Sequence, residues 1–230
     1  MFDIGIIGAL DDEVKNIIAR LDGHASEMIS GIEFNTGTLF GKKIVVARCG
    51  VGKVFAAICA EAMIIRYNPG LVVNTGVGGA LDPTLRPLDV VVASDLVQHD
   101  MDTSPIGDPV GLISGINKIY FDTDKRAVDI LTRAADTLGV KTLVGTVASG
   151  DKFIAESSDK EYIRRTFGAV SCEMEGAAVA HTAFVNDTPV IVIRAISDSA
   201  DGDASMDYMT FLPKAAEMST KLTLSLIENY

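Results

Sequence analysis

Four segments of the sequence place small or acidic residues directly after short apolar runs that are typical of buried strands. The segments are Gly8-Ala9-Leu10-Asp11-Asp12-Glu13, Asn74-Thr75-Gly76-Val77-Gly78-Gly79, Cys172-Glu173-Met174-Glu175-Gly176 and Arg194-Ala195-Ile196-Ser197-Asp198. In open α/β sheets, ligands bind beyond the carboxyl ends of the strands. Carboxyl groups at such an edge can act as general acids or bases and can stabilise a developing cation. The sequence therefore predicts that these segments meet around a ligand.

The glycine-rich segments do not match the common phosphate-binding motifs. Gly76-Val77-Gly78 has the start of a dinucleotide fingerprint, but Leu81 stands where the third glycine is required. Gly52-Lys53 is followed by valine, and Ala47 replaces the leading glycine of a phosphate-binding loop. The histidines have no metal-ligand spacing: His24, His99 and His181. The sequence predicts neither a cofactor nor a metal site.

An alternation of strands and helices must position these segments. Apolar, β-branched runs predict strands at Phe2–Gly8, Ile32–Leu39, Lys43–Arg48, Leu71–Thr75, Val90–Val97, Thr142–Ser149, Ala169–Cys172 and Val190–Ile196. Helical spacing predicts helices at Asp11–Leu21, Lys53–Tyr67, Asp124–Leu138, Ser158–Phe167, Met174–Phe184 and Asp207–Glu228. This order predicts an α/β fold, with one domain over residues 1–230 and a central mixed, largely parallel twisted sheet flanked by helices. His99–Asn117, rich in Asp, Gly, Pro and Ser, predicts a long functional loop.

The composition limits the partners and the compartment. Of the 230 residues, 48% are hydrophobic and 22% are charged, which favours an oligomer that covers part of the apolar surface. The formal net charge of −11 repels phosphate backbones and anionic lipids, so nucleic acids and membranes are not expected as partners. Cys49, Cys59 and Cys172 are expected to be free thiols in a reducing compartment. Met1–Leu10 does not resemble a signal peptide and no run could span a membrane, so we expect a cytoplasmic protein.

Five motifs together resemble those of one enzyme family. They are Gly5-Ile6-Ile7-Gly8-Ala9, Asn74-Thr75-Gly76, Ser149-Gly150-Asp151-Lys152-Phe153, Glu173-Met174-Glu175 and Arg194-Ala195-Ile196-Ser197-Asp198. From Ile4 to Leu226, the chain resembles the 5'-methylthioadenosine/S-adenosylhomocysteine nucleosidases of the purine nucleoside phosphorylase-like superfamily. The resemblance implies a nucleoside phosphorylase-like fold. It also implies a hydrolase that releases adenine from these nucleosides and related 5'-deoxyadenosines, without a cofactor, in nucleoside catabolism and methionine salvage.

The resemblance assigns roles to the acidic residues. Cleaving an N-glycosidic bond requires a general acid for the leaving purine, carboxylates beside the sugar cation and a base for the attacking water. Asp198 matches the family's general acid, which protonates adenine N7, and Ser197 beside it would orient the carboxyl group. Glu175 matches the residue that binds the ribose hydroxyls, and Met174 would pack under the sugar. Glu13 matches the base that activates water.

The resemblance also predicts the rest of the pocket. Phe153 and Ile154 match the adenine slot, and Tyr208 aligns with an aromatic residue that covers the nucleoside. Arg194 is expected either to pair with Glu13 and keep it ionised, or to form a buried structural ion pair. The remaining wall is expected to contain Leu10, Val51, Val77 and Gly78.

Two parts of the chain depart from the family pattern. Val77 stands where relatives often carry a small hydroxyl residue, and the loop His99–Asn117 does not match theirs. In the family, a loop from the neighbouring subunit completes the pocket for the 5'-substituent. The corresponding segment is Met101–Ile106, so the resemblance implies a homodimer in which Ile106 contacts the substrate of the partner. The preferred 5'-substituent stays open.

Other functions compete with this hydrolase. A purine nucleoside phosphorylase needs cations around phosphate, whereas the first loop here is Asp11-Asp12-Glu13, which favours water as the nucleophile. A hydrolase specific for another 5'-substituted adenosine, such as aminodeoxyfutalosine, stays open. A non-catalytic purine-binding protein is expected to lack at least one of Glu13, Glu175 and Asp198, and all three are present.

Overall fold

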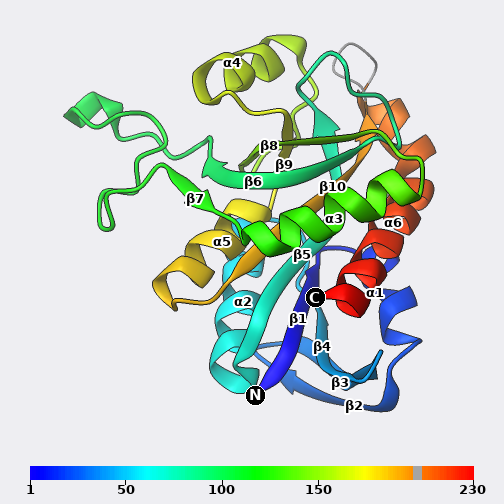
Figure 1. Cartoon of the computed structure of the whole chain (residues 1–230). Coiled ribbons are helices and arrows are strands. Elements are labelled where there is room, and N and C mark those ends of the chain that lie inside the picture. Colours follow the sequence, from blue (N-terminus) through cyan, green and yellow to red (C-terminus); the bar gives the residue numbers. More distant parts are fainter. Residues whose placement is uncertain (199–203) are drawn as a thin grey trace.

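The computed structural model describes residues 1–198 and 204–230, without the side chains of residues 204–207. The strands of the described part belong to one sheet (Figure 1), in the order β10-β6-β8-β9-β5-β1-β4-β3-β2, with β7 beside β6. They are β1 (Phe2–Gly8), β2 (Asp22–Ile29), β3 (Ile32–Leu39), β4 (Lys42–Arg48), β5 (Pro69–Ala80), β6 (Val90–Gln98), β7 (Tyr120–Asp122), β8 (Thr142–Ser149), β9 (Ser171–Glu173) and β10 (Val190–Asp198).

One half of the sheet closes on itself. β10 pairs with β5 in parallel and with β6 in antiparallel orientation, so that β10, β6, β8, β9 and β5 form a ring. Among the pairings of the described residues, five are parallel and five are antiparallel. The predicted mixed α/β fold is confirmed. The sheet is more evenly mixed than expected, because β2–β3–β4 is antiparallel and the short strands β7 and β9 add antiparallel pairs.

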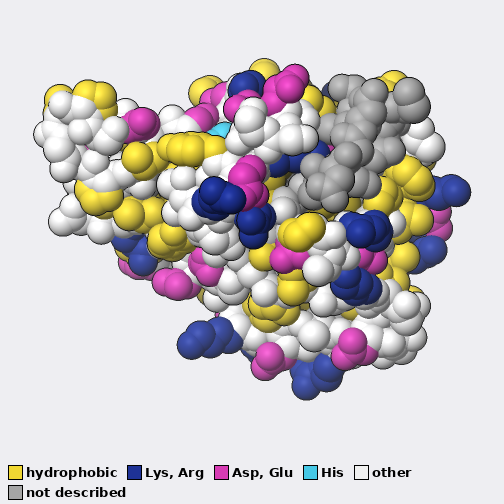
Figure 2. Space-filling model, turned by 90° about the horizontal axis from the view of Figure 1, so that it is seen from above, with side chains coloured by type: hydrophobic (Ala, Val, Ile, Leu, Met, Phe, Trp, Pro, Cys, Tyr) yellow, Lys and Arg dark blue, Asp and Glu magenta, His cyan; other side chains and the backbone are white. Residues whose placement is uncertain are grey.

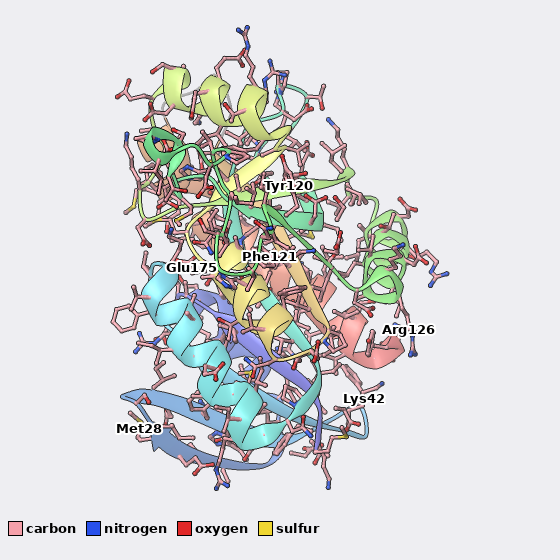
Figure 3. All side chains as sticks on the ribbon, turned by 90° about the vertical axis from the view of Figure 1, so that its left-hand side faces the viewer. Met28, Lys42, Tyr120, Phe121, Arg126 and Glu175 are labelled. Carbon is pink, nitrogen blue, oxygen red and sulfur yellow. The ribbon has the colours of Figure 1, made fainter. Side chains whose placement is uncertain are left out.

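Helices cover both faces of the sheet. On one face α2 and α5 pack together, and Figure 3 shows them side by side on the near surface; α1, α3 and α6 cover the other face, and α4 covers one end. Their bounds are α1 (Asp11–Ile18), α2 (Lys53–Tyr67), α3 (Lys125–Thr137), α4 (Ser157–Phe167), α5 (Gly176–Val185) and α6 (Ala204–Asn229). Within the described ranges, no helix is apolar over a length that would cross a bilayer.

The alternation of side chains along the central strands builds two apolar cores. Ile7 and Val72 point into the core beneath α2 and α5, whereas their neighbours Ile6 and Val73 point into the core beneath α1, α3 and α6. This alternation follows from the pleat of a strand. Because both faces are covered, the central strands are rich in buried apolar residues on both sides.

The structure differs from the prediction in the N-terminal region and at β5, which extends over Pro69–Ala80 instead of Leu71–Thr75. The strand β2 (Asp22–Ile29) was not predicted, because its residues are largely exposed and polar and show no apolar alternation. The preceding helix ends at Ile18 instead of Leu21, which leaves room for the chain to turn into β2. The three-residue strand β7 (Tyr120–Asp122) is too short to give a periodic signal and was also missed.

The segment His99–Asn117 forms the predicted long loop. It contains only one short 3-10 helix, η1 (Ser104–Ile106), and a bridge from Ile113 to Lys118 among its described residues. The loop projects from the body of the molecule, on the left of Figure 1. Figure 2 shows hydrophobic side chains at its tip, where Ile106 is 83% exposed. A loop that projects in this way offers its apolar tip to another surface.

Candidate active site

A cavity opens where β1, β5, β9 and β10 end and α5 begins. It holds about 600 Å³ of space that is free of atoms, part of it open to solvent. Arg194 and Ile106 are not on its wall. The other residues singled out from the sequence all lie there: Leu10, Glu13, Val51, Val77, Gly78, Phe153, Ile154, Met174, Glu175, Ser197, Asp198 and Tyr208.

Asp198 is the last residue of β10 and is only 2% exposed. The Ser197 hydroxyl donates to its Oδ1 over 3.0 Å, and the Lys160 ammonium lies 3.3 Å from its Oδ2. Gly79 of the paired strand β5 has no side chain, and a Cβ there would lie 3.0 Å from Oδ2. The carboxyl group is therefore held on both oxygens at the cavity wall.

Glu13 lies in the first turn of α1 and turns back toward the end of β1. Its Oε2 accepts hydrogen bonds from the backbone N–H groups of Ala9 (2.7 Å) and Leu10 (2.9 Å), and its Oε1 accepts one from Val77 (3.2 Å). Burial raises the pKa of Glu13, and these N–H donors and the more distant Arg194 charge oppose that rise. A carboxyl group whose pKa is raised is better able to accept a proton at neutral pH.

The backbone of β5 passes very close to Glu13. A Cβ on Gly76 would lie only 2.6 Å from Glu13 Oε1, a distance that side chains do not tolerate. Glycine at this position lets the strand and the carboxylate share the cavity wall. The same strand therefore makes room for Glu13 and, at Gly79, for Asp198.

Glu175 is the residue that precedes α5. Its Oε1 accepts a 2.8 Å hydrogen bond from the Gly52 N–H, across a distance of 123 positions in the chain. Gly52 has a φ of 99°, a conformation that glycine adopts readily. Burial raises the pKa of Glu175 to about 7, the charge of Glu173 adds to the rise, and Arg194 opposes it. Glu175 therefore changes its charge close to neutral pH.

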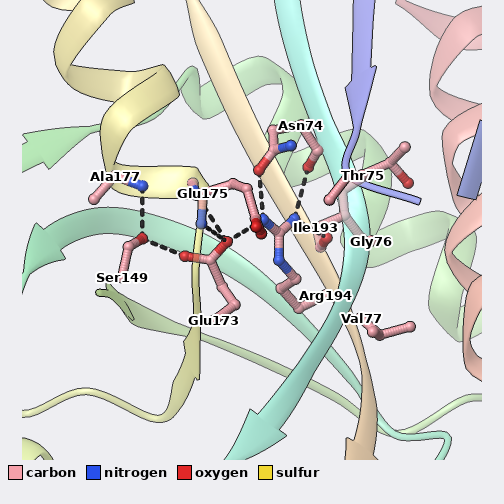
Figure 4. A network of polar contacts seen from close by, with 12 residues as sticks. Asn74, Thr75, Gly76, Val77, Ser149, Glu173, Glu175, Ala177, Ile193 and Arg194 are labelled. Carbon is pink, nitrogen blue, oxygen red and sulfur yellow. Dashed lines mark hydrogen bonds and ion pairs between the residues drawn. The ribbon is translucent and has the colours of Figure 1, made fainter. Parts of the chain in front are cut away.

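Glu173, on the cavity wall, and Arg194, behind it, form a buried network (Figure 4). Arg194 forms an ion pair with Glu173 and donates to Asn74, whose backbone carbonyl is 3.1 Å away. Glu173 also accepts from the Ser149 hydroxyl and from the backbone N–H of Glu175 (3.0 Å). Two roles were considered for Arg194: a pair with Glu13 and a buried structural ion pair. The structure shows the second, with Glu173 as the partner. The network fixes the backbone that carries Glu175.

Two aromatic side chains border the apolar part of the cavity. The rings of Phe153 and Tyr208 meet edge to face, with centroids 5.5 Å apart and planes at 78°. Ile154 beside them is buried. Together with Ile154, the two rings form an apolar slot that shares the cavity with the carboxyl group of Asp198. Among the described side chains, no group of three or more His, Cys, Asp or Glu residues is arranged to hold a metal ion.

Comparison with known proteins identifies the family. The profile of the phosphorylase superfamily matches residues 3–228. A 5'-methylthioadenosine/S-adenosylhomocysteine nucleosidase from Psychromonas ingrahamii is 35% identical over 228 residues, which cover 98% of each chain. The chain belongs to this nucleosidase family. A nucleosidase of the same name from a Shewanella species is 37% identical, again over 98% of each chain.

Solved structures of the nucleosidase family have the same fold. The enzyme from Neisseria meningitidis in complex with methylthio-immucillin-A superimposes with a TM-score of 0.95 at 31% identity and full coverage of both chains. An aspartate-to-asparagine variant of the Helicobacter pylori nucleosidase, with 5'-methylthioadenosine in its active site, has a TM-score of 0.95 at 32% identity, again with full coverage of this chain. A futalosine hydrolase from Helicobacter pylori has a TM-score of 0.94 at 33% identity and covers 100% of this chain and 98% of its own.

Two residues of the nucleosidase site were missed in the sequence. The sequence singles out Glu173 only as part of the Glu173-Met174-Glu175 motif, and its ion pair with Arg194 joins β9 to β10, two strands that are separated by α5 in the chain and are not paired with each other in the sheet. Lys160 carried one usable signal: it shares the buried face of α4 with Ile163 and Phe167, at spacings of three and seven. A lysine on an apolar helix face needs a buried partner.

Proposed function

We propose that this chain hydrolyses the N-glycosidic bond of 5'-methylthioadenosine, S-adenosylhomocysteine and related 5'-deoxyadenosines and releases adenine. The observation that carries the proposal is the convergence of Glu13, Glu175 and Asp198 on one cavity. Its relatives at 35–37% identity have the same activity in their names. The enzyme belongs to nucleoside catabolism and methionine salvage, and its free, buried thiols suit the reducing cytoplasm.

Each carboxyl group has one task in this reaction. Asp198 donates a proton to adenine N7, so that the base does not leave as an anion when its bond to the sugar breaks. Glu175 accepts hydrogen bonds from the ribose hydroxyls, and its charge stabilises the cation that forms on the sugar. Glu13 takes a proton from the water that attacks the sugar on the face opposite the base.

A phosphate-free assay tests the proposal. Adenine release is expected to be independent of phosphate, because the carboxylate of Glu13 occupies the place where a phosphorylase would need cations. The assay measures adenine from 5'-methylthioadenosine, S-adenosylhomocysteine, adenosine and inosine, with and without phosphate. A ribose 1-phosphate product would contradict hydrolysis.

The substrate panel also addresses a second candidate function. The similarity to the futalosine hydrolase of Helicobacter pylori favours a larger 5'-substituted adenosine, such as aminodeoxyfutalosine, as an additional substrate. That compound is included in the same assay, and the highest kcat/KM identifies the preferred 5'-substituent. A rate for inosine equal to that for the adenosines would contradict the assignment of Ile154 and Phe153 to an adenine slot.

The proposal includes a homodimer. The helix α2 exposes Val54 (69%) and Ile65 (71%), which line a surface groove together with Ile58 and Val185. A contiguous apolar face of this kind marks an interface. The projecting loop places Ile106 away from the cavity of its own chain. In the dimer, Met101–Ile106 of each subunit closes the 5' end of the pocket of the other.

Sedimentation at the assay concentration tests the dimer. The wild-type protein is expected to sediment as a dimer, and Ile58→Lys with Ile65→Lys is expected to give a monomer with reduced adenine release, because two buried charges oppose association. Leu138→Lys is the matched control, since Leu138 is exposed at the end of α3 on the opposite face. A fully active wild-type monomer would refute the shared pocket.

A further inference from the structure

Lys160 reaches Asp198 from behind the cavity. The lysine lies in α4 and is only 3% exposed, although most of α4 is polar and faces solvent. Its Nζ forms an ion pair with Asp198 Oδ2 at 3.3 Å. Lys160 is not on the cavity wall, whereas Asp198 is. The ammonium group therefore contacts the proposed general acid from the side that a bound nucleoside does not occupy.

Packing alone does not account for a lysine at this position. The same face of α4 carries Ile163 and Phe167, which belong to a small apolar core with Ala148 and Cys172. An apolar side chain of similar length would extend that core. Burying an ammonium group instead costs desolvation, and buried ion pairs are often no more stable than apolar replacements. The charge of Lys160 is therefore better explained by what it does to Asp198.

We infer that Lys160 is a positioning residue for the reaction, holding Asp198 Oδ2 while Ser197 holds Oδ1. With both oxygens anchored from the protein side, the carboxyl group has one orientation toward the purine. General acid catalysis requires such alignment with N7. The inference rests on the proposed function, because it takes Asp198 as the proton donor.

Several titratable groups of the described residues lie around Asp198. Burial, followed by the charge of Asp198, raises the pKa of the Cys172 thiol to about 12, so this group stays neutral. Burial also raises the pKa of the Tyr208 hydroxyl. Lys160 forms an ion pair with Asp198. The acidic groups that share the cavity with Asp198 are Glu13, Glu173 and Glu175, and the cation Lys152 also lines it.

Lys160→Met tests the inference, because methionine keeps the length and removes the charge. The expected result is a kcat for adenine release that is lower by about 10- to 100-fold, the effect of a misaligned catalytic group. The basic limb of the kcat/KM profile is expected to move to higher pH, because without the cation Asp198 keeps its proton longer. Lys160→Arg keeps the charge, so the basic limb of its kcat/KM profile is expected to lie at the wild-type pH. A wild-type kcat in Lys160→Met, together with a basic limb of kcat/KM at the wild-type pH, would overturn the inference.

A double variant separates positioning from a purely structural role. If Lys160 acts through Asp198, adding Lys160→Met to Asp198→Asn lowers kcat no further. A structural lysine would lower kcat by the same factor in both backgrounds, and that result would overturn the inference. Arg165→Met is the matched control, because it removes an exposed cation from the same helix.

Adenine binding adds a measurement that does not need turnover. Calorimetry is expected to show weaker adenine binding by about tenfold in Lys160→Met, since N7 then meets a misaligned carboxyl group. Binding is expected to be unchanged in Arg165→Met. Adenine release by the wild-type enzyme, measured in the same series, tests the proposed function by itself. An inactive wild-type enzyme refutes the proposed function. Unchanged adenine binding in Lys160→Met refutes the positioning role of Lys160.

Discussion

Replacing Asp198 with asparagine is expected to lower kcat for adenine release by about 10²- to 10⁴-fold, the usual contribution of a general acid. Asparagine has nearly the same shape and still accepts from the Ser197 hydroxyl, but it has no carboxyl proton to give to N7. The measurement is kcat under saturating 5'-methylthioadenosine. KM is expected to change much less than kcat, because the side chain still fills its place on the cavity wall.

The control for this variant is Asp129→Asn, which removes an exposed aspartate from α3. It is expected to turn over at the wild-type rate. Thermal unfolding of both variants shows that the fold is kept. A near-normal kcat in Asp198→Asn would show that Asp198 is not the general acid and that another group donates the proton.

Replacing Glu175 with glutamine is expected to lower kcat/KM by about 10²- to 10³-fold, the effect of losing one preorganised electrostatic contact in a transition state. Glutamine can still bond one ribose hydroxyl, but it brings no negative charge to the sugar cation. Glu33→Gln, an exposed glutamate of β3, is the matched control and is expected to leave kcat/KM unchanged.

The same residue predicts the pH dependence of the wild-type enzyme. The pKa of Glu175 is raised to about 7, so its carboxylate is the main form above this value and the neutral acid is the main form below it. Because the carboxylate is the form that stabilises the cation, kcat/KM is expected to fall as the pH drops through this value. The measurement is the pH profile of kcat/KM under unsaturating substrate. A flat profile on both sides of neutrality would contradict the role of Glu175.

The sequence predicts those elements best whose ends carry strong signals. The helix Lys53–Tyr67 was predicted with its observed bounds, because Gly52 precedes it and Asn68, in the left-handed conformation, ends it before Pro69. The strand Phe2–Gly8 was predicted equally well, because it is apolar and buried on both faces. The strand β2 (Asp22–Ile29) has neither signal: it is held by its pairing with β3, a contact that local composition does not reveal.

The same distinction applies to the site. Glu13, Glu175 and Asp198 could be assigned because each follows a buried strand within a recognisable motif. Their supporting contacts could not be predicted, because they join segments that are remote in the chain. Lys160 and Asp198 are 38 positions apart, and Glu173 and Arg194 are 21 apart. Spacing along one helix or strand carries no information about such pairs.

Two glycines of β5 limit the substitutions that this site can accept. A Cβ at Gly76 would lie 2.6 Å from Glu13 Oε1 and one at Gly79 would lie 3.0 Å from Asp198 Oδ2, so either substitution would require the neighbouring carboxyl group to shift. Changes at these two positions are therefore expected to disturb the proposed catalytic groups. In the loop His99–Asn117, by contrast, a Cβ at Gly115 would meet no atom within 4 Å. Exchanges at this position are therefore expected to leave the two carboxyl groups in place.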